Sequence, residues 1–150
     1  MMSDFKPYID RLRSSGLRPT KQRLAICKTL FGKPETFHFT IESLKKIISR
    51  DIKYKISIAT LYNTVHTLKK KGHLKQISLH NRKAYFDTNT KKHHHFYDED
   101  TDKLSDIKNE DILVSKVPHT PKGKKIKEIE VVVSIASDNH NQRKIVKSIT

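Results

Sequence analysis

The spacing of apolar residues along the chain changes at Gly72. Before this residue, apolar side chains recur at helical spacing in four successive segments, bounded by capping residues, glycine or proline. After it, two short segments have β character and enclose the polar, basic turn His80-Asn81-Arg82. The chain therefore begins with helices and continues with a β-hairpin.

This order of elements is that of a winged helix, in which the hairpin contacts the DNA backbone beside the groove that the preceding helix enters. The expected elements are a helix over residues 3–15, a helix opened by Pro19-Thr20 and ended by Gly32, a helix capped by Thr40, a helix capped by Ser57, and strands over residues 73–79 and 83–87.

The distribution of charge agrees with a nucleic-acid partner. The chain carries a net charge of +15, and residues 1–84 hold 19 Lys and Arg against 5 Asp and Glu, a net +14. Residues 85–150 hold 12 against 11, a net +1. Basic side chains that neutralise phosphates release counterions, so a half of this kind favours double-stranded DNA. An anionic membrane surface is the rival partner, but the basic half has no strongly amphipathic helix for insertion.

A second unit is expected after a linker at residues 88–92. Its predicted elements are strands over residues 93–99 and 103–108, a short helix over 110–117 and a β-like run over 125–136. A unit of this size buries little apolar surface, and its run Val131-Val132-Val133 calls for a partner. A second copy of the chain is the simplest partner, which predicts a two-fold homodimer.

The predicted class is therefore α+β, with a winged-helix DNA-binding domain at residues 1–87 and a small α/β dimerisation and sensing domain at residues 93–150. No apolar run is long enough to cross a bilayer, and Met1 to Lys6 lack the features of a signal peptide. Cys27 is the single cysteine, which excludes an internal disulfide. These features predict a cytoplasmic protein with no membrane partner.

The fourth predicted helix, which begins after Ser57, has two faces. The face expected in the core comprises Ile58, Leu61, Val65 and Leu68. The outward face comprises Ala59, Thr60, Asn63 and His66, with Tyr62 at the boundary. Small side chains allow close approach to a major groove, and Asn or Thr can hydrogen-bond bases or phosphates. An ordinary solvated helix is the alternative, and the basic charge with the hairpin favours DNA reading.

Three consecutive histidines begin the first strand of the second unit. Alternation places His93 and His95 on one face of the strand and His94 on the other. Two imidazoles with carboxylates form a donor set for Zn²⁺, Fe²⁺ or Mn²⁺, and Asp87 and Asp106 are near in the sequence. A hairpin puts Asp106 roughly opposite His95, although a shift of one residue would move it to the other face. A solvated polar strand is the alternative.

These motifs together resemble those of the ferric uptake regulator family. Gly16-Leu-Arg-Pro-Thr, Ser57-Ile-Ala-Thr-Leu-Tyr-Asn and His93-His-His carry the resemblance, which extends from Tyr8 to Ile135. The stretch from His93 to Thr101 is most similar to the iron response regulator branch, whose members respond to haem. The resemblance implies a metal- or haem-responsive transcription regulator, a repressor of genes of iron or haem homeostasis, that binds palindromic operators as a dimer.

The resemblance also implies the site residues. A sensing site is expected from His38, Asp87, His93, His95 and Asp106, and a haem contact from His93, His94 and His95. The expected DNA contacts are Arg18, Arg23, Ser57, Thr60, Tyr62 and Asn63. Many relatives hold a structural zinc with paired cysteine motifs, which this chain lacks. No structural Cys₄ zinc is expected, and Cys27 is interpreted as a core residue.

Several functions stay open at this point. The first is a regulator that responds to a divalent metal (Fe, Mn or Zn), to haem, or to both. Peroxide or manganese sensing within the same family is an alternative. An architectural DNA-binding protein without an effector is another. A metallohydrolase would need a general base beside an open metal position, and neither a His-Glu-x-x-His helix nor a nucleophile arrangement is present, so no enzyme is expected.

Overall fold

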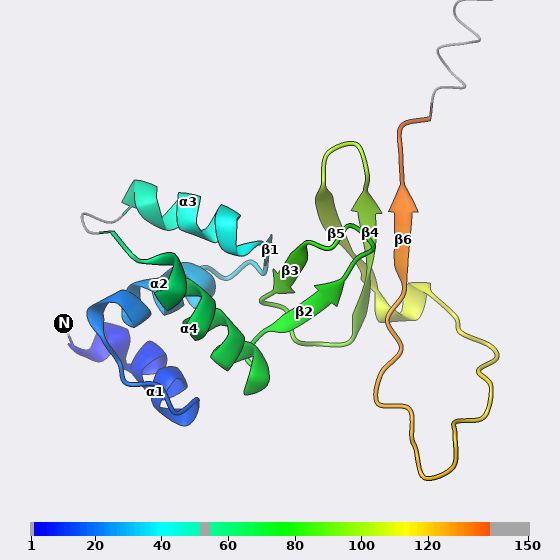
Figure 1. The fold of residues 1–150 in the computed structure, drawn as a ribbon, viewed down its shortest axis with the longest axis horizontal. Helices are drawn as coiled ribbons and strands as arrows, with labels where there is room; N and C mark the ends of the chain where they lie inside the picture. The colour runs from blue at the N-terminus through cyan, green and yellow to red at the C-terminus, as the bar shows by residue number, and fades with distance from the viewer. Residues whose placement is uncertain (1, 52–54, 139–150) are drawn as a thin grey trace, which may run out of the picture. The chain divides into compact units, whose positions relative to one another are not determined.

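The computed structural model describes residues 2–51 and 55–138 (Figure 1). They form two compact units, Met1–Lys91 and Lys92–Thr150, and the division lies inside segment 88–92. The first unit contains η1 (Met2–Phe5), α1 (Lys6–Ser14), α2 (Lys21–Phe31), β1 (His38–Phe39), α3 (Ile41–Asp51), α4 (Ile58–Lys70), β2 (Lys75–Ser78) and β3 (Ala84–Asp87). The second contains β4 (His93–Asp98), β5 (Lys103–Lys108), η2 (Asn109–Asp111) and β6 (Val132–Ile135). The predicted α+β class is confirmed.

The helices begin where the sequence places capping residues. Thr20 Oγ1 accepts a hydrogen bond from the backbone N–H of Arg23 at 3.3 Å, and Ser57 Oγ accepts one from that of Thr60 at 3.1 Å. Thr40 and Ser43 cap each other, since each side-chain oxygen accepts from the other residue's backbone N–H. These bonds satisfy amide groups that have no partner inside the helix, and they fix the entry points of α2, α3 and α4.

The core of the first unit lies between the four helices and the sheet. Side chains that are almost wholly buried come from each helix, among them Leu12, Ile26, Leu44 and Leu61. Phe86 of β3 is fully buried and stacks on Phe39 of β1, with ring centroids 5.5 Å apart. The hairpin is therefore packed on the helices, as a winged helix requires.

Strand β1 is a feature that the sequence does not predict. It pairs antiparallel with β3, which also pairs with β2, so the sheet has the order β1-β3-β2. A strand of two residues is too short to show alternation. Its register places His38 opposite Asp87 and Phe39 opposite Phe86. His38, which reads as a loop residue in the sequence, is thus held beside a carboxylate.

The prediction that Ile58 of α4 lies in the core is wrong. Ile58 is 50% exposed, whereas Leu61, Val65 and Leu68 are fully buried. Thr64 takes the inward position with no exposed surface, and its Oγ1 donates to the carbonyl of Thr60 at 2.7 Å. The buried face therefore comprises residues 61, 64, 65 and 68, and Ile58, at the first position of the helix, lies at its edge.

In the second unit, β4 lies between β5 and β6 (Figure 1). It pairs antiparallel with β5, with His95 opposite Asp106, and parallel with β6, with His95 opposite Val132. His94 adds a side-chain contact to the second pairing, since its Nδ1 accepts a hydrogen bond from the backbone N–H of Val131 at 3.0 Å.

Two elements predicted for the second unit differ from the structure: the expected helix is wrong, and the expected strand is shorter than predicted. The helix expected over residues 110–117 is only the single turn η2, because Ile112 already has extended backbone angles of φ −123° and ψ 122°. The β-like run over 125–136 yields only β6, and the described residues between η2 and β6 form no helix or strand. Apolar residues of this stretch, Leu113, Val114, Ile126 and Ile129, are between 42% and 89% exposed in the single chain.

No helix among the described residues has the length and apolar character needed to cross a membrane.

The single cysteine is a core side chain of α2. Cys27 has no exposed surface, and burial raises the pKa of its thiol to about 12, with a small opposing effect from the charge of Arg11. Only the thiolate is a good nucleophile and metal ligand. The structure thus agrees with the interpretation of Cys27 as a packing residue.

We therefore expect the Cys27 thiol to resist an aromatic disulfide reagent at pH 8 in the native protein. With a pKa of about 12, only about one thiol in 10⁴ is ionised at that pH. Absorbance of the released thiolate should rise only when denaturant is added. Complete reaction within seconds under native conditions would show that the thiol is accessible and that its assignment to the core is wrong.

Candidate metal centre and nucleic-acid interface

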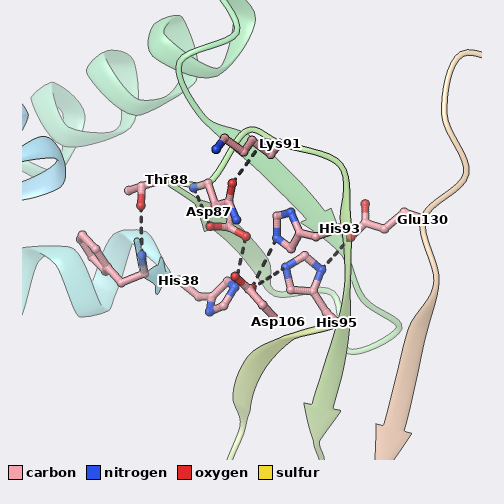
Figure 2. Close-up of polar contacts among 10 residues, drawn as sticks. His38, Asp87, Thr88, Lys91, His93, His95, Asp106 and Glu130 are labelled. Atoms are coloured by element: carbon pink, nitrogen blue, oxygen red, sulfur yellow. Dashed lines mark hydrogen bonds and ion pairs between the residues drawn. The ribbon is translucent and has the colours of Figure 1, made fainter. Parts of the chain in front are cut away.

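The second unit gathers two imidazoles around one carboxylate. Because successive side chains of β4 point to opposite faces, His93 and His95 lie on the same face, with ring centroids 4.5 Å apart. Asp106 faces them from β5, in the register that the hairpin gives. Its Oδ1 lies 3.4 Å from His93 Nε2 and 3.5 Å from His95 Nε2, and Figure 2 shows both rings turned toward it.

This group of three fits a metal ion. The two nitrogens converge on a single oxygen at separations longer than the usual 2.7–3.2 Å of an N–H···O bond. Ligand atoms that share one ion at about 2.0–2.2 Å lie roughly 3–4 Å from one another, and the separations found here fall in that range. His93 and His95 are 7% and 1% exposed, so the three donors form a partly enclosed site.

The first unit contributes a second pair of donors. His38 Nε2 lies 3.1 Å from Asp87 Oδ2, as the pairing of β1 with β3 requires. Asp87 has no exposed surface. A buried carboxylate is costly unless it is compensated by hydrogen bonds, a cation or a metal ion. The pair therefore has the composition of a half-site for a cation.

The segment after Asp87 is shaped by two successive turns. Asp87 Oδ1 accepts a hydrogen bond from the backbone N–H of Asn89 at 2.8 Å, and Asn89 Oδ1 accepts one from that of Lys91 at 3.1 Å. Thr88 Oγ1 accepts a hydrogen bond from the backbone N–H of Phe37 at 3.0 Å, and the backbone N–H of Thr88 donates one to the carbonyl of Phe37 at 3.2 Å. Asp87 thus serves two purposes, since one oxygen orders the chain and the other faces His38.

The structure adds one residue to this region that the sequence does not identify. Glu130 Oε1 lies 3.2 Å from His95 Nδ1, on the opposite edge of the ring from Asp106 (Figure 2). Its only signal in the sequence is an acidic residue within a β-like run, which does not indicate its partner. His94 is on the other face of β4, as alternation predicts, and bonds to Val131.

The candidate DNA contacts on α4 lie at and near its first turn. Ser57 caps the helix, and its hydroxyl is 2.8 Å from that of Thr60. Asn63 is exposed, and Tyr62 is 56% exposed with its ring 4.0 Å from that of His66. The exposed Ile58, one turn before Tyr62, extends this surface with an apolar side chain that was expected in the core. Apolar and amide groups of this kind match the edges of bases in a major groove.

The two candidate arginines before and within α2 lie together. The guanidinium of Arg23 donates a hydrogen bond to the carbonyl of Arg18 at 3.0 Å, and Arg18 is exposed. Two basic side chains beside a helix N-terminus form a favourable surface for a phosphate.

Comparison with known proteins identifies relatives among metal-responsive transcription regulators. The model of the ferric uptake regulator family matches residues 14–134. A peroxide-responsive repressor, PerR, from Staphylococcus aureus is 33% identical over 104 residues, which is 69% of this chain and 68% of the repressor.

Two solved structures share the fold. The ferric uptake regulator from Pseudomonas aeruginosa with manganese has a TM-score of 0.64 at 18% identity and covers 87% of this chain and 97% of its own. The Vibrio cholerae ferric uptake regulator also has a TM-score of 0.64 at 18% identity, with coverage of 86% and 98%. At this identity the structures establish the fold alone. Because the family model spans most of the chain, this protein belongs to the ferric uptake regulator family of metal-responsive, DNA-binding transcription regulators.

Proposed function

We propose that the chain is a dimeric repressor whose effector is a divalent metal ion bound by His38, Asp87, His93, His95 and Asp106. The observation that carries the proposal is the convergence of His93 and His95 on one oxygen of Asp106. The pair His38 and Asp87 supplies the remaining donors. Six residue steps separate Asp87 from His93, at most about 20 Å of extended chain, so a shared ion would draw together two strand ends that are already close in the sequence.

The donor set favours Fe²⁺ or Mn²⁺. Five protein ligands, three imidazoles and two carboxylates, exceed the four that a closed structural zinc site uses. Imidazole with carboxylate is a donor combination that suits iron and manganese, and Zn²⁺ is the competitor to be tested. Peroxide sensing is a related proposal, which rests on the similarity to the staphylococcal repressor.

Haem is a weaker candidate for the effector than a bare metal ion. Membership of the haem-responsive branch is therefore also the weaker proposal. His93, His94 and His95 are all less than 8% exposed. His94 accepts a backbone hydrogen bond from Val131, and His95 lies against Glu130. An axial ligand to haem would have to give up these contacts, whereas a bare ion fits among the donors as they stand.

Ligation from both units gives the ion its regulatory effect. A ligand shifts a conformational equilibrium only by its differential affinity for the two states. An ion that needs donors from both units favours one arrangement of them, and a ~100-fold difference in affinity supplies about 2.7 kcal/mol. In a dimer this arrangement sets the spacing of the two α4 helices, and therefore the fit to a palindromic operator.

The dimer itself is supported by the apolar side chains of the second unit. Phe96, Leu113, Val114, Val117, Ile126, Ile129, Val133 and Ile135 are all at least 36% exposed in the single chain. A soluble monomer rarely leaves such a set uncovered.

A cytoplasmic, non-enzymatic regulator is consistent with a family of transcription regulators.

The test is operator selection from random DNA by the purified full chain, followed by affinity measurements with Mn²⁺, Fe²⁺, Zn²⁺, haem or a chelator. We expect a two-fold symmetric site and an affinity that changes about 5–150-fold between Mn²⁺ or Fe²⁺ and chelator. Equal affinity under all five conditions would favour an architectural DNA-binding protein. A response to haem alone would reverse the preference for a bare ion.

A further inference from the structure

Glu130 lies in the segment that enters β6 and contacts a metal-site histidine from outside the metal site. Its Oε1 is 3.2 Å from His95 Nδ1, and its side chain is 25% exposed against 2% for His95. An ionised carboxylate can only accept a hydrogen bond, so this contact requires the ring proton to be on Nδ1. In a neutral ring the other nitrogen, Nε2, then carries the lone pair.

That lone pair is directed into the group of donors described above. His95 Nε2 faces Asp106 Oδ1 at 3.5 Å. With the proton on Nδ1, the two facing atoms are both acceptors, so a cation between them could be bound by both. With the proton on Nε2, the ring would instead donate to Asp106 and the position for an ion would be blocked. Glu130 therefore selects the form of His95 that can bind a metal.

The backbone next to Glu130 is held against β4 by its neighbour Val131. Val131 donates its backbone N–H to His94 Nδ1 at 3.0 Å and accepts a hydrogen bond from the backbone N–H of His95 at 3.1 Å. These two bonds attach the backbone beside Glu130 to β4, so the residue extends from a backbone position next to His95.

We propose that Glu130 is a positioning residue: it fixes the Nδ1–H tautomer of His95, keeps Nε2 available to the effector ion, and joins the metal site to the segment entering β6. The inference rests on the proposed function, since it assigns a role toward the same ion. Loss of a carboxylate or carbonyl that orients a ligating histidine typically weakens metal binding by about 10–100-fold.

The experiment compares the full-length parent with Glu130→Ala, Glu130→Gln and the control Glu128→Ala, which removes the same charge two residues earlier. In metal-free protein, ¹⁵N NMR of the His95 ring should report the Nδ1–H tautomer in the parent, in Glu130→Gln and in the control, and a shift toward Nε2–H in Glu130→Ala. Gln retains an oxygen that accepts from Nδ1, so this variant also separates the tautomer effect from any loss of folding in the alanine variant.

Co²⁺ serves as the metal probe because its visible bands report its ligands. Glu130→Ala should bind Co²⁺ about 10–100-fold more weakly than the parent, and Glu128→Ala within about 3-fold of it. The spectrum of saturated Glu130→Ala should match that of the parent. A changed spectrum would make Glu130 a ligand rather than a positioning residue. Parent-like affinity, or an unchanged tautomer in the alanine variant, would also overturn the proposal. If the parent binds Co²⁺ without any change in DNA affinity, the proposed regulation fails while the role of Glu130 stands.

Discussion

The double variant His93→Ala, His95→Ala is expected to fold, to dimerise and to bind operator DNA with the same affinity in Mn²⁺ and in chelator. Both imidazoles point at Asp106 Oδ1, at 3.4 and 3.5 Å, so the change removes two of the three donors of the second unit. The loss of a single residue that merely orients a ligand already costs about 10–100-fold in metal affinity, and the loss of two ligands should exceed 100-fold. Mn²⁺ affinity is measured by chelator competition and DNA affinity by fluorescence anisotropy.

The free energy of unfolding of the double variant should change much less than its affinity for Mn²⁺. The two rings contact each other and two carboxylates, and neither belongs to the apolar core of the first unit. His119→Ala, on an exposed residue, is the matched control and should respond to Mn²⁺ as the parent does. A double variant that still responds to Mn²⁺ as the parent does would show that the ion acts elsewhere.

His94→Ala separates the two faces of β4. His94 is buried and bonds to Val131 on the face opposite His93 and His95, so its removal should weaken the attachment of β6. We expect a lower thermal midpoint and a smaller effect on Mn²⁺ affinity than in the double variant.

A structural element could be predicted from the sequence where its pattern of apolar and capping residues is long enough to be recognised. The long helices and their caps follow from local chemistry, and Thr20, Thr40 and Ser57 cap the helices as predicted. The facing of His95 and Asp106 is confirmed by the pairing of β4 with β5, although the sequence alone left this register open by one residue.

Other features depend on tertiary contacts that no local pattern carries. Strand β1 has two residues and exists because β3 offers it a free edge. Ile58 is half exposed at the start of α4, whereas the polar Thr64 is fully buried because its hydroxyl is satisfied by the carbonyl of Thr60. Glu130 meets His95 across 35 positions, through a strand pairing in which only four residue pairs specify the register.

DNA binding is expected to depend strongly on salt concentration. The basic half of the chain carries a net +14 over residues 1–84, and a dimer presents it twice. If the dimer neutralises roughly 6–10 phosphates, its affinity should fall by about 10³–10⁵ between 50 and 200 mM salt. A titration of labelled operator at four salt concentrations gives the slope. A change of less than 10-fold over this range would show that the basic surface does not contact the DNA backbone.

Two single variants separate the electrostatic part of this affinity from base reading. Arg23 lies beside Arg18 at the start of α2, and Arg23→Ala should weaken binding to operator and random DNA alike, reducing the salt slope by about 1 for each phosphate that is no longer neutralised. Tyr62 is 56% exposed on α4 and carries no charge, so Tyr62→Ala should leave the slope unchanged and lower the preference for operator, at about 1–3 kcal/mol for each base that the side chain reads. Equal losses on both DNAs for Tyr62→Ala would count against base reading by α4. An unchanged slope for Arg23→Ala would show that this arginine does not bind a phosphate, because counterion release follows only from charges that meet the backbone.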